Sequence, residues 1–197
     1  MHSSIKIVGL VGPKGVGKTT LANLLVHTAQ RNVNASVLSF AEPLRQMAVA
    51  MGVDAQRLSD PKLKHEEIPG LGITPRVLLQ TLGTEWGREY MGDDVWLWSM
   101  EQQIARVMSQ CLYDKRDAVI FIDDCRFQNE AEWILNHGGM LIQVKRCGVT
   151  YTGEHISEMP MPLDTPMAMH TANVDEALDD LVEKTLHVIN YKLKTSC

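Results

Sequence analysis

The 197-residue sequence has few cysteines, and their spacing suggests neither a zinc ribbon nor a disulfide framework. Its four cysteines, Cys111, Cys125, Cys147 and Cys197, form no CxxC pair, which favours a reduced, cytoplasmic setting. No apolar run approaches the roughly 20 residues that cross a bilayer, and the first residues lack the layout of a signal peptide. We therefore expect a soluble protein, cytoplasmic (in the host cytoplasm if it comes from a phage), without a membrane partner.

The sequence also lacks a strong excess of positive charge, internal repeats and low-complexity tracts. Its 19 Lys and Arg residues against 24 Asp and Glu residues give a formal net charge of -5. This balance argues against broad coating of nucleic acid, although it leaves room for a local basic pocket. With 45% hydrophobic residues, the chain is long enough to bury a sizeable core, and we expect a single domain over residues 1–197.

Short apolar segments alternate with helical patterns along the chain. The predicted strands are Ile5–Val11, Ala35–Phe40, Ala118–Ile122 and Met140–Val144, with a short fifth around Met167–Ala172. The segment 118–122 has no polar alternation, as expected for a strand buried on both faces of a parallel sheet. The predicted fold class is therefore α/β, with a parallel sheet of about five strands covered on both faces by helices.

The helical segments carry recognisable start signals. Pro43 suits a first helical position, and Thr74 followed by Pro75 predicts an N-cap and the first residue of another helix. Asn173, with Glu176 three residues later, predicts the cap of the last helix. Between the regular segments, the Pro- and Gly-rich stretches 59–74 and 148–166 are long enough to suggest lids or binding loops.

One motif carries a specific chemistry. Residues 12–19, GPKGVGKT, match GxxxxGK[ST] between a predicted strand and a predicted helix, an arrangement in which backbone N–H groups and the helix N-terminus bind phosphate. Lys18 would reach the β/γ oxygens of a nucleoside triphosphate, and the Thr19 hydroxyl would ligate Mg²⁺. The predicted ATP-binding residues are Gly12, Lys14, Gly15, Val16, Gly17, Lys18, Thr19 and Thr20. The motif alone does not distinguish a kinase from a GTPase or a mechanical ATPase. The sequence has no NKxD element for guanine, which argues against a GTPase, and the chain is short for a motor protein.

The helix that starts at Thr74 predicts an acceptor site. At 100° per residue, Arg76, Gln80, Gly83 and Gly87 lie on one stripe, with Arg88 at its edge. A guanidinium, an amide and two positions without side chains suit a flat ligand that carries a phosphate. The alternative is a solvated polar face. Each glycine inside a helix, however, lowers helix stability by roughly 1 kcal/mol relative to alanine, and a solvated face does not explain why two of them are present.

The tryptophans near this helix are more ambiguous. Trp86 falls on the face of Leu79 and Leu82, so we expect it in the core rather than against a base. Trp96 shares a stripe with Met100, so we expect it in the core as well. Both tryptophans nevertheless remain candidate substrate contacts.

Two acidic residues, Asp123 and Asp124, follow the buried strand at its carboxyl end, where open α/β sheets bind ligands. We expect one of them to be linked to the metal, with a helix-capping turn as the alternative. Arg126 beside them could bind an acceptor phosphate, whereas Glu130 could either contact substrate or cap the next helix.

Further along, Arg146 lies where a closing loop could bring a cation to the transferring phosphoryl group, and His155 is a weaker candidate for a ligand contact. Arg45 lies near the end of the second predicted strand. The sequence favours neither of two roles for it, a contact with phosphate or a charge on the surface.

Five segments together resemble the bacteriophage-type deoxynucleoside monophosphate kinases. They are GPKGVGKTT at 12–20, FAEPLR at 40–45, TPRVLLQTLGTEWGR at 74–88, DDCRFQNEAE at 123–132 and HISE at 155–158. The resemblance covers nearly the whole chain in the right order. It implies a three-layer P-loop kinase fold with an acceptor-binding insertion at about 43–113 and a LID at about 147–168. It also implies transfer of the γ-phosphoryl group of ATP to a dNMP, with Mg²⁺.

The resemblance also implies roles for particular residues. Lys18 and Thr19 would serve ATP and Mg²⁺, the residues Arg76, Gln80, Arg88 and Arg126 would face the dNMP, and Arg146 with residues 155–158 would belong to the LID.

The residues and the resemblance together give the predicted site. The predicted catalytic residues are Lys18, Arg126 and Arg146, and the predicted metal residues are Thr19, Asp123 and Asp124. The predicted substrate contacts are Phe40, Arg45, Arg76, Gln80, Trp86, Arg88, Trp96, Arg126, Glu130, His155 and Glu158.

Two other functions stay open at this point. One is a P-loop kinase that acts on a modified nucleotide or another small phosphorylated acceptor. The other is an ATP-dependent nucleic-acid-binding or regulatory module, against which the net charge speaks. We expect a small-molecule dNMP partner and no stably bound nucleic acid, while the preferred base, the choice between dNMP and rNMP, and a homodimer are left open by the sequence.

Overall fold

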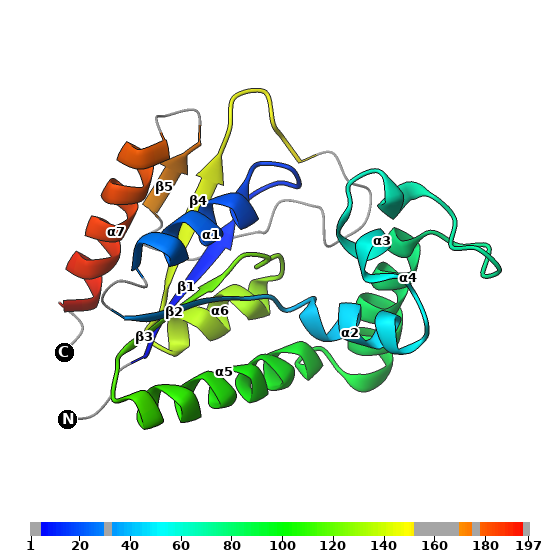
Figure 1. Cartoon of the computed structure of the whole chain (residues 1–197), viewed down its shortest axis with the longest axis horizontal. Helices are drawn as coiled ribbons and strands as arrows, with labels where there is room; N and C mark the ends of the chain where they lie inside the picture. Colours follow the sequence, from blue (N-terminus) through cyan, green and yellow to red (C-terminus); the bar gives the residue numbers. More distant parts are fainter. Residues whose placement is uncertain (1–4, 30–32, 152–169, 175–177, 195–197) are drawn as a thin grey trace. The chain divides into compact units, whose positions relative to one another are not determined.

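The computed structural model describes residues 5–29, 33–151, 170–174 and 178–194, and its chain forms two compact units. One unit, here called the sheet unit, contains the chain up to Ser39 and from Gln103 onward. The other, the helical unit, is Phe40–Gln102. The chain therefore crosses between the units twice, after Ser39 and before Gln103 (Figure 1).

The sheet unit is built on five parallel strands in the order β2-β3-β1-β4-β5. The strands are β1 Ile5–Val11, β2 Asn34–Leu38, β3 Ala118–Ile122, β4 Met140–Lys145 and β5 His170–Asn173. In register, Ile122 lies opposite both Gly9 of β1 and Leu38 of β2, so the carboxyl ends of these strands meet at one edge of the sheet. The predicted α/β class with five parallel strands is confirmed.

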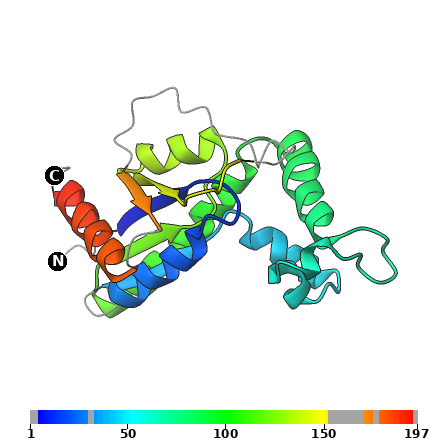
Figure 2. The same cartoon turned by 90° about the horizontal axis from the view of Figure 1, so that it is seen from above.

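Helices cover both faces of this sheet, as Figures 1 and 2 show. They are α1 Lys18–Ala29, α6 Gln128–Asn136, α7 Leu178–Lys194 and the second half of α5 Val95–Asp114. Val8 and Leu10 of β1 are fully buried in one cluster with Leu21 of α1 and residues of α7. Gly9, between them, faces the other way, where a Cβ would lie 2.6 Å from a methyl group of Ile134 in α6. The alternating pleat therefore places α1 and α7 on one face and α6 on the other.

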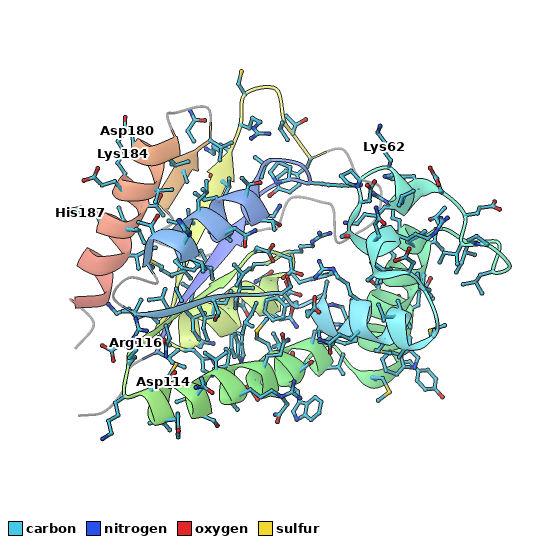
Figure 3. All side chains as sticks on the ribbon, in the orientation of Figure 1. Lys62, Asp114, Arg116, Asp180, Lys184 and His187 are labelled. Atoms are coloured by element: carbon cyan, nitrogen blue, oxygen red, sulfur yellow. The ribbon has the colours of Figure 1, made fainter. Side chains whose placement is uncertain are left out.

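The last helix is amphipathic. Asp180, Lys184 and His187, labelled in Figure 3, are exposed, whereas Leu181 and Thr185 are buried. No helix among the described residues is long and apolar enough to span a membrane.

Strand pairing sets the ends of two strands. Asn173 is the final residue of β5, and the next N–H, of Val174, donates to Lys145 O at 2.9 Å. Glu176, the partner of Asn173 in the predicted cap, lies outside the described residues, and α7 is Leu178–Lys194. The strand β2 was predicted to end at Phe40 but ends at Leu38, because its partner β3 ends at Ile122.

The helical unit packs short helices around Ala48, Val53, Leu58, Ile68 and Leu78. Its elements are α2 Glu42–Ala50, α3 Ala55–Ser59, the 3₁₀ turn η1 Leu63–His65, α4 Pro75–Thr81, the π-helix η2 Leu82–Met91 and the start of α5.

The start of α4 agrees with the sequence. The Thr74 hydroxyl oxygen accepts from the Val77 N–H at 3.3 Å, and Pro75 occupies the first turn. The stretch 59–74 is more structured than expected, since Ile68 is buried and its N–H donates to Ile73 O at 2.9 Å.

The helix predicted to run from Thr74 through Arg88 is not α-helical throughout. From Leu82 to Met91 it is a π-helix, whose i→i+5 hydrogen bonds place more residues in each turn. Side chains after Leu82 therefore rotate away from the 100° pattern. Trp86, expected in the core, is 40% exposed, while Arg88 is buried.

Candidate active site

The candidate site lies at the carboxyl edge of the sheet, where β1, β2, β3 and β4 end. Gly12 begins the phosphate loop directly after β1, with φ of +152°, and a Cβ there would lie 2.6 Å from Val144 O. Gly17 has φ of +104° and ends the loop where α1 begins at Lys18. Both positions require glycine because their φ angles are positive. The loop leads directly into the N-terminus of α1, which favours anions.

Lys18 lies inside this loop. Its Nζ donates to Gly12 O at 2.6 Å and to Pro13 O at 2.9 Å. Burial, followed by the positive charge of Arg126, lowers the pKa of Lys18 from 10.5 to about 8, against the opposing effect of Asp123 and other acidic groups. The surroundings thus destabilise the charged form of Lys18, and a bound phosphate would stabilise it.

Asp123, which follows β3, accepts two hydrogen bonds from hydroxyl groups. Thr19 Oγ1 donates to Oδ2 at 2.5 Å, and Ser39 Oγ donates to Oδ1 at 2.6 Å. Asp123 is 6% exposed, so these bonds form largely away from water. They connect Asp123, rather than Asp124, directly to the proposed metal residue Thr19.

This donor set fits Mg²⁺, which prefers oxygen ligands and retains several waters and substrate phosphates. The Thr19 hydroxyl donates its proton in the hydrogen bond to Asp123. The lone pairs of the hydroxyl oxygen therefore remain available to a cation. Within residues 5–29, 33–151, 170–174 and 178–194, no group of three or more His, Cys, Asp or Glu side chains could hold a metal. Phosphate oxygens and waters would therefore supply most of the coordination.

Two arginines come to the same edge as Lys18. Arg126, in the turn after β3, is exposed and near enough for its charge to act on Lys18. Arg146 follows β4, and its Nη2 lies 3.3 Å from the position that a Cβ on Gly17 would take. Three predicted catalytic cations, far apart in the sequence, thus surround one loop.

Glu130 holds the turn that carries Arg126. Its Oε2 accepts from the N–H groups of Arg126 at 2.8 Å and Phe127 at 3.1 Å, and the residue is 2% exposed. Of the two roles considered for Glu130, the geometry therefore corresponds to the helix cap. The neighbouring Cys125 is buried, and burial together with Glu130 and Asp124 raises the pKa of its thiol well above 9.0, so it stays neutral.

The predicted acceptor residues lie in the helical unit, where several have internal partners. Arg45 pairs with Glu42 of the same helix at 3.2 Å. Arg88 Nη1 donates to Asp93 O at 3.1 Å. Arg76 and Gln80 are half-buried on α4, and Phe40 is buried.

The two glycines of the predicted ligand-facing stripe serve packing. A Cβ on Gly87 would lie 2.7 Å from Trp96 Cε2, and one on Gly83 would lie 3.2 Å from Leu44. Trp96 is 5% exposed, as its stripe predicted, and its Nε1 donates to Gly83 O at 2.8 Å. Trp86, 6.3 Å from Trp96 between ring centroids, is the more exposed tryptophan.

Some predictions lie outside the described residues. His155, Glu158 and most of the expected LID at 147–168 belong to this part of the chain. Conversely, Ser39 was not predicted from the sequence, although its place directly after a strand that ends at the same edge as β3 was an available signal.

Known proteins resemble this chain in sequence. Residues 8–127 match the family model described as ATPase family associated with various cellular activities (AAA). A protein of Acanthamoeba polyphaga mimivirus, named as a deoxynucleotide monophosphate kinase, is 33% identical over 167 residues, or 79% of this chain and 81% of that protein. The deoxynucleoside-5'-monophosphate kinase of Escherichia phage T5 is 33% identical over 106 residues, which are 50% of this chain and 39% of that protein.

Solved structures that resemble the chain include other kinases. The APS kinase of Mycobacterium tuberculosis has a TM-score of 0.43 at 11% identity, covering 95% of this chain and 99% of that chain. A gluconokinase from Sinorhizobium meliloti has a TM-score of 0.46 at 9% identity, covering 98% and 95%. On the sequence relatives and the phosphate-loop geometry, the chain belongs to the deoxynucleotide monophosphate kinase family of P-loop proteins.

Proposed function

We propose that this nucleotide kinase transfers the γ-phosphoryl group of ATP to a deoxynucleoside monophosphate, giving ADP and a dNDP. The observation that carries the proposal is the gathering of Lys18, Arg126 and Arg146 around the phosphate loop, beside the Thr19–Asp123 pair. The names of the mimivirus and phage relatives support the choice of acceptor.

The phosphates of ATP would replace the carbonyl oxygens of Gly12 and Pro13 as partners of Lys18. The Lys18 ammonium then contacts the β and γ oxygens, and the N-terminus of α1 adds further positive potential. Thr19 and Asp123 would hold Mg²⁺, which supplies charge neutralisation between the β- and γ-phosphates when bound. Phosphate binding thus satisfies the charged form of a lysine whose pKa is lowered in the nucleotide-free protein.

In the transfer, an oxygen of the acceptor phosphate forms a bond to the γ-phosphorus. The bond from the γ-phosphorus to the β–γ bridging oxygen breaks, and ADP leaves with that electron pair. Arg126 and Arg146 neutralise charge on the transferring group and the acceptor phosphate, because guanidinium groups match phosphate oxygens bidentately. The side chain of Glu130 keeps the backbone at Arg126 in place.

For the acceptor, we propose Arg76 and Gln80 of α4 as polar contacts and Trp86 as an aromatic surface for the base. Trp86 is partly exposed, as a stacking residue must be, whereas Trp96 and Arg88 are buried and would support the contacts indirectly. Arg76→Lys keeps the charge but removes the planar fork. We expect it to weaken dNMP binding about tenfold and to leave ATP binding unchanged by titration calorimetry; equal weakening of both ligands would remove Arg76 from the acceptor site.

The decisive experiment supplies ATP and Mg²⁺ with a panel of dNMPs and rNMPs and separates all nucleotide products by chromatography. We expect ADP and dNDP in equal amounts, and Lys18→Ala should lower this turnover at least about 100-fold. ADP formed without any diphosphate product would instead indicate an ATPase. Transfer only to a modified nucleotide would support the other kinase considered above.

A further inference from the structure

The carboxylate of Asp123 is fixed from two sides. Oδ2 accepts from Thr19 and Oδ1 accepts from Ser39, at 2.5 and 2.6 Å. A carboxylate rotates easily about its last bond, because the energy wells of that torsion are broad. Two hydroxyl donors, one in the first turn of α1 and one directly after β2, remove this freedom, and each bond is strengthened by the negative charge.

Ser39 is itself held in position. It is 8% exposed and follows β2 directly, and the preceding residue Leu38 accepts from the Asp123 N–H at 3.3 Å. The side-chain amide of Gln103 donates to Ser39 O at 3.4 Å. Ser39 is the last residue of the sheet unit before the chain enters the helical unit, and Gln103 is the first residue after the chain returns.

We infer that Ser39 is a positioning residue, which orients the Asp123 carboxylate so that the Thr19 hydroxyl directs its lone pairs at Mg²⁺. Thr19 must donate its single proton to Asp123 if both lone pairs are to stay available. A carboxylate that turns away would leave that proton free to point toward the cation. The inference rests on the proposed binding of Mg²⁺ and nucleotide at this loop, but not on the identity of the acceptor.

The chain offers a matched control for this role. Ser36 lies on β2, three residues before Ser39, and its hydroxyl is buried without a hydrogen-bond partner among the described residues. Ser36→Ala therefore removes a nearby serine hydroxyl without touching Asp123. Ser39→Thr keeps a hydroxyl and is the rescuing variant, and Ser39→Cys keeps the size with a much weaker donor.

The experiment measures ADP affinity by titration calorimetry with and without Mg²⁺ for the full-length protein and each variant. We expect Ser39→Ala to reduce the gain in ADP affinity from Mg²⁺ about tenfold while the affinity for ADP alone stays unchanged. Ser39→Cys should show the same trend, so the inference is tested even where the alanine variant does not fold. Ser39→Thr should restore the gain, and Ser36→Ala should match the wild type.

The inference is overturned where Ser39→Ala keeps the full effect of Mg²⁺, where ADP alone binds more weakly by the same factor, or where Ser36→Ala behaves identically. These outcomes are separable from the proposed function. A wild-type protein that binds ADP more tightly with Mg²⁺ yet phosphorylates no dNMP refutes the function and leaves Ser39 in its role. A dNMP kinase whose Ser39→Ala variant responds normally to Mg²⁺ refutes only the role of Ser39.

Discussion

Nucleotide affinity should fall as the pH rises from 7 to 9, because the nucleotide-free protein loses the Lys18 proton in this range. Burial and the charge of Arg126 lower the pKa of Lys18 to about 8. With that pKa, about nine in ten nucleotide-free molecules carry the ammonium at pH 7 and about one in ten at pH 9. Bound phosphates favour the charged form, so binding at pH 9 must first take up a proton. ADP affinity should therefore fall about tenfold, or about 1.4 kcal/mol.

The same pKa has the opposite effect on the stability of the nucleotide-free protein. The unfolded chain keeps the proton of Lys18 up to its ordinary pKa of 10.5, whereas the folded protein releases it at about 8. Between these values the unfolded state binds more protons, so the contribution of Lys18 to the free energy of unfolding rises with pH. Deprotonation of Lys18 therefore does not destabilise the folded protein at high pH. Weaker nucleotide binding there cannot be attributed to unfolding caused by this group.

Titration calorimetry with ADP and excess Mg²⁺ between pH 7 and 9 measures the effect. In two buffers of different ionisation enthalpy, the wild type should take up close to one proton per ADP at pH 9. The terminal phosphate of ADP is already ionised, since its pKa lies near 6. Lys18→Arg, whose guanidinium stays charged, should bind with little pH dependence. An affinity that is flat for the wild type, or that falls equally in Lys18→Arg, would refute the assignment.

Three stability predictions concern other parts of the chain. Gly87→Ala forces a Cβ against the Trp96 ring and should lower the free energy of unfolding by about 1–3 kcal/mol in urea melts, whereas Gly83→Ala meets only a flexible leucine and should cost less. Lys115 has φ of +54° at the end of α5, so Lys115→Gly should stabilise by about 0.5–1 kcal/mol; a loss would contradict the strain. Thr185 is fully buried, and its hydroxyl has no hydrogen-bond partner among the described residues. Thr185→Val should therefore raise the free energy of unfolding by about 1 kcal/mol, and an unchanged urea midpoint would indicate that the hydroxyl is satisfied.

Much of the sheet could be predicted from the sequence, because parallel strands buried on both faces leave a plain signal. Ile5–Val11 and Ala118–Ile122 were predicted with the bounds that the structure has. The error at the end of β2 arises from its pairing with β3, a strand far apart in the chain. The local sequence of residues 35–40 contains no information about this pairing.

The site was predictable where chemistry depends on a local motif. The loop from Gly12 to Thr19 and the acidic residue after β3 follow from motif and strand order. Ser39 was missed because a serine after a strand has no special pattern, and only the register of β2 with β3 brings it to Asp123.

The acceptor helix shows why the remaining residues were harder. A glycine inside a helix indicates a close approach, but the sequence does not say of what. The prediction assumed a ligand at Gly83 and Gly87, whereas the structure has Leu44 and Trp96 there. The change to a π-helix after Thr81 is not encoded in the apolar spacing either, and it brings Trp86 to the surface. Trp86, which the sequence assigned to the core, is thereby exposed, and the contact that we propose between Trp86 and the base of a dNMP depends on that change of helical geometry.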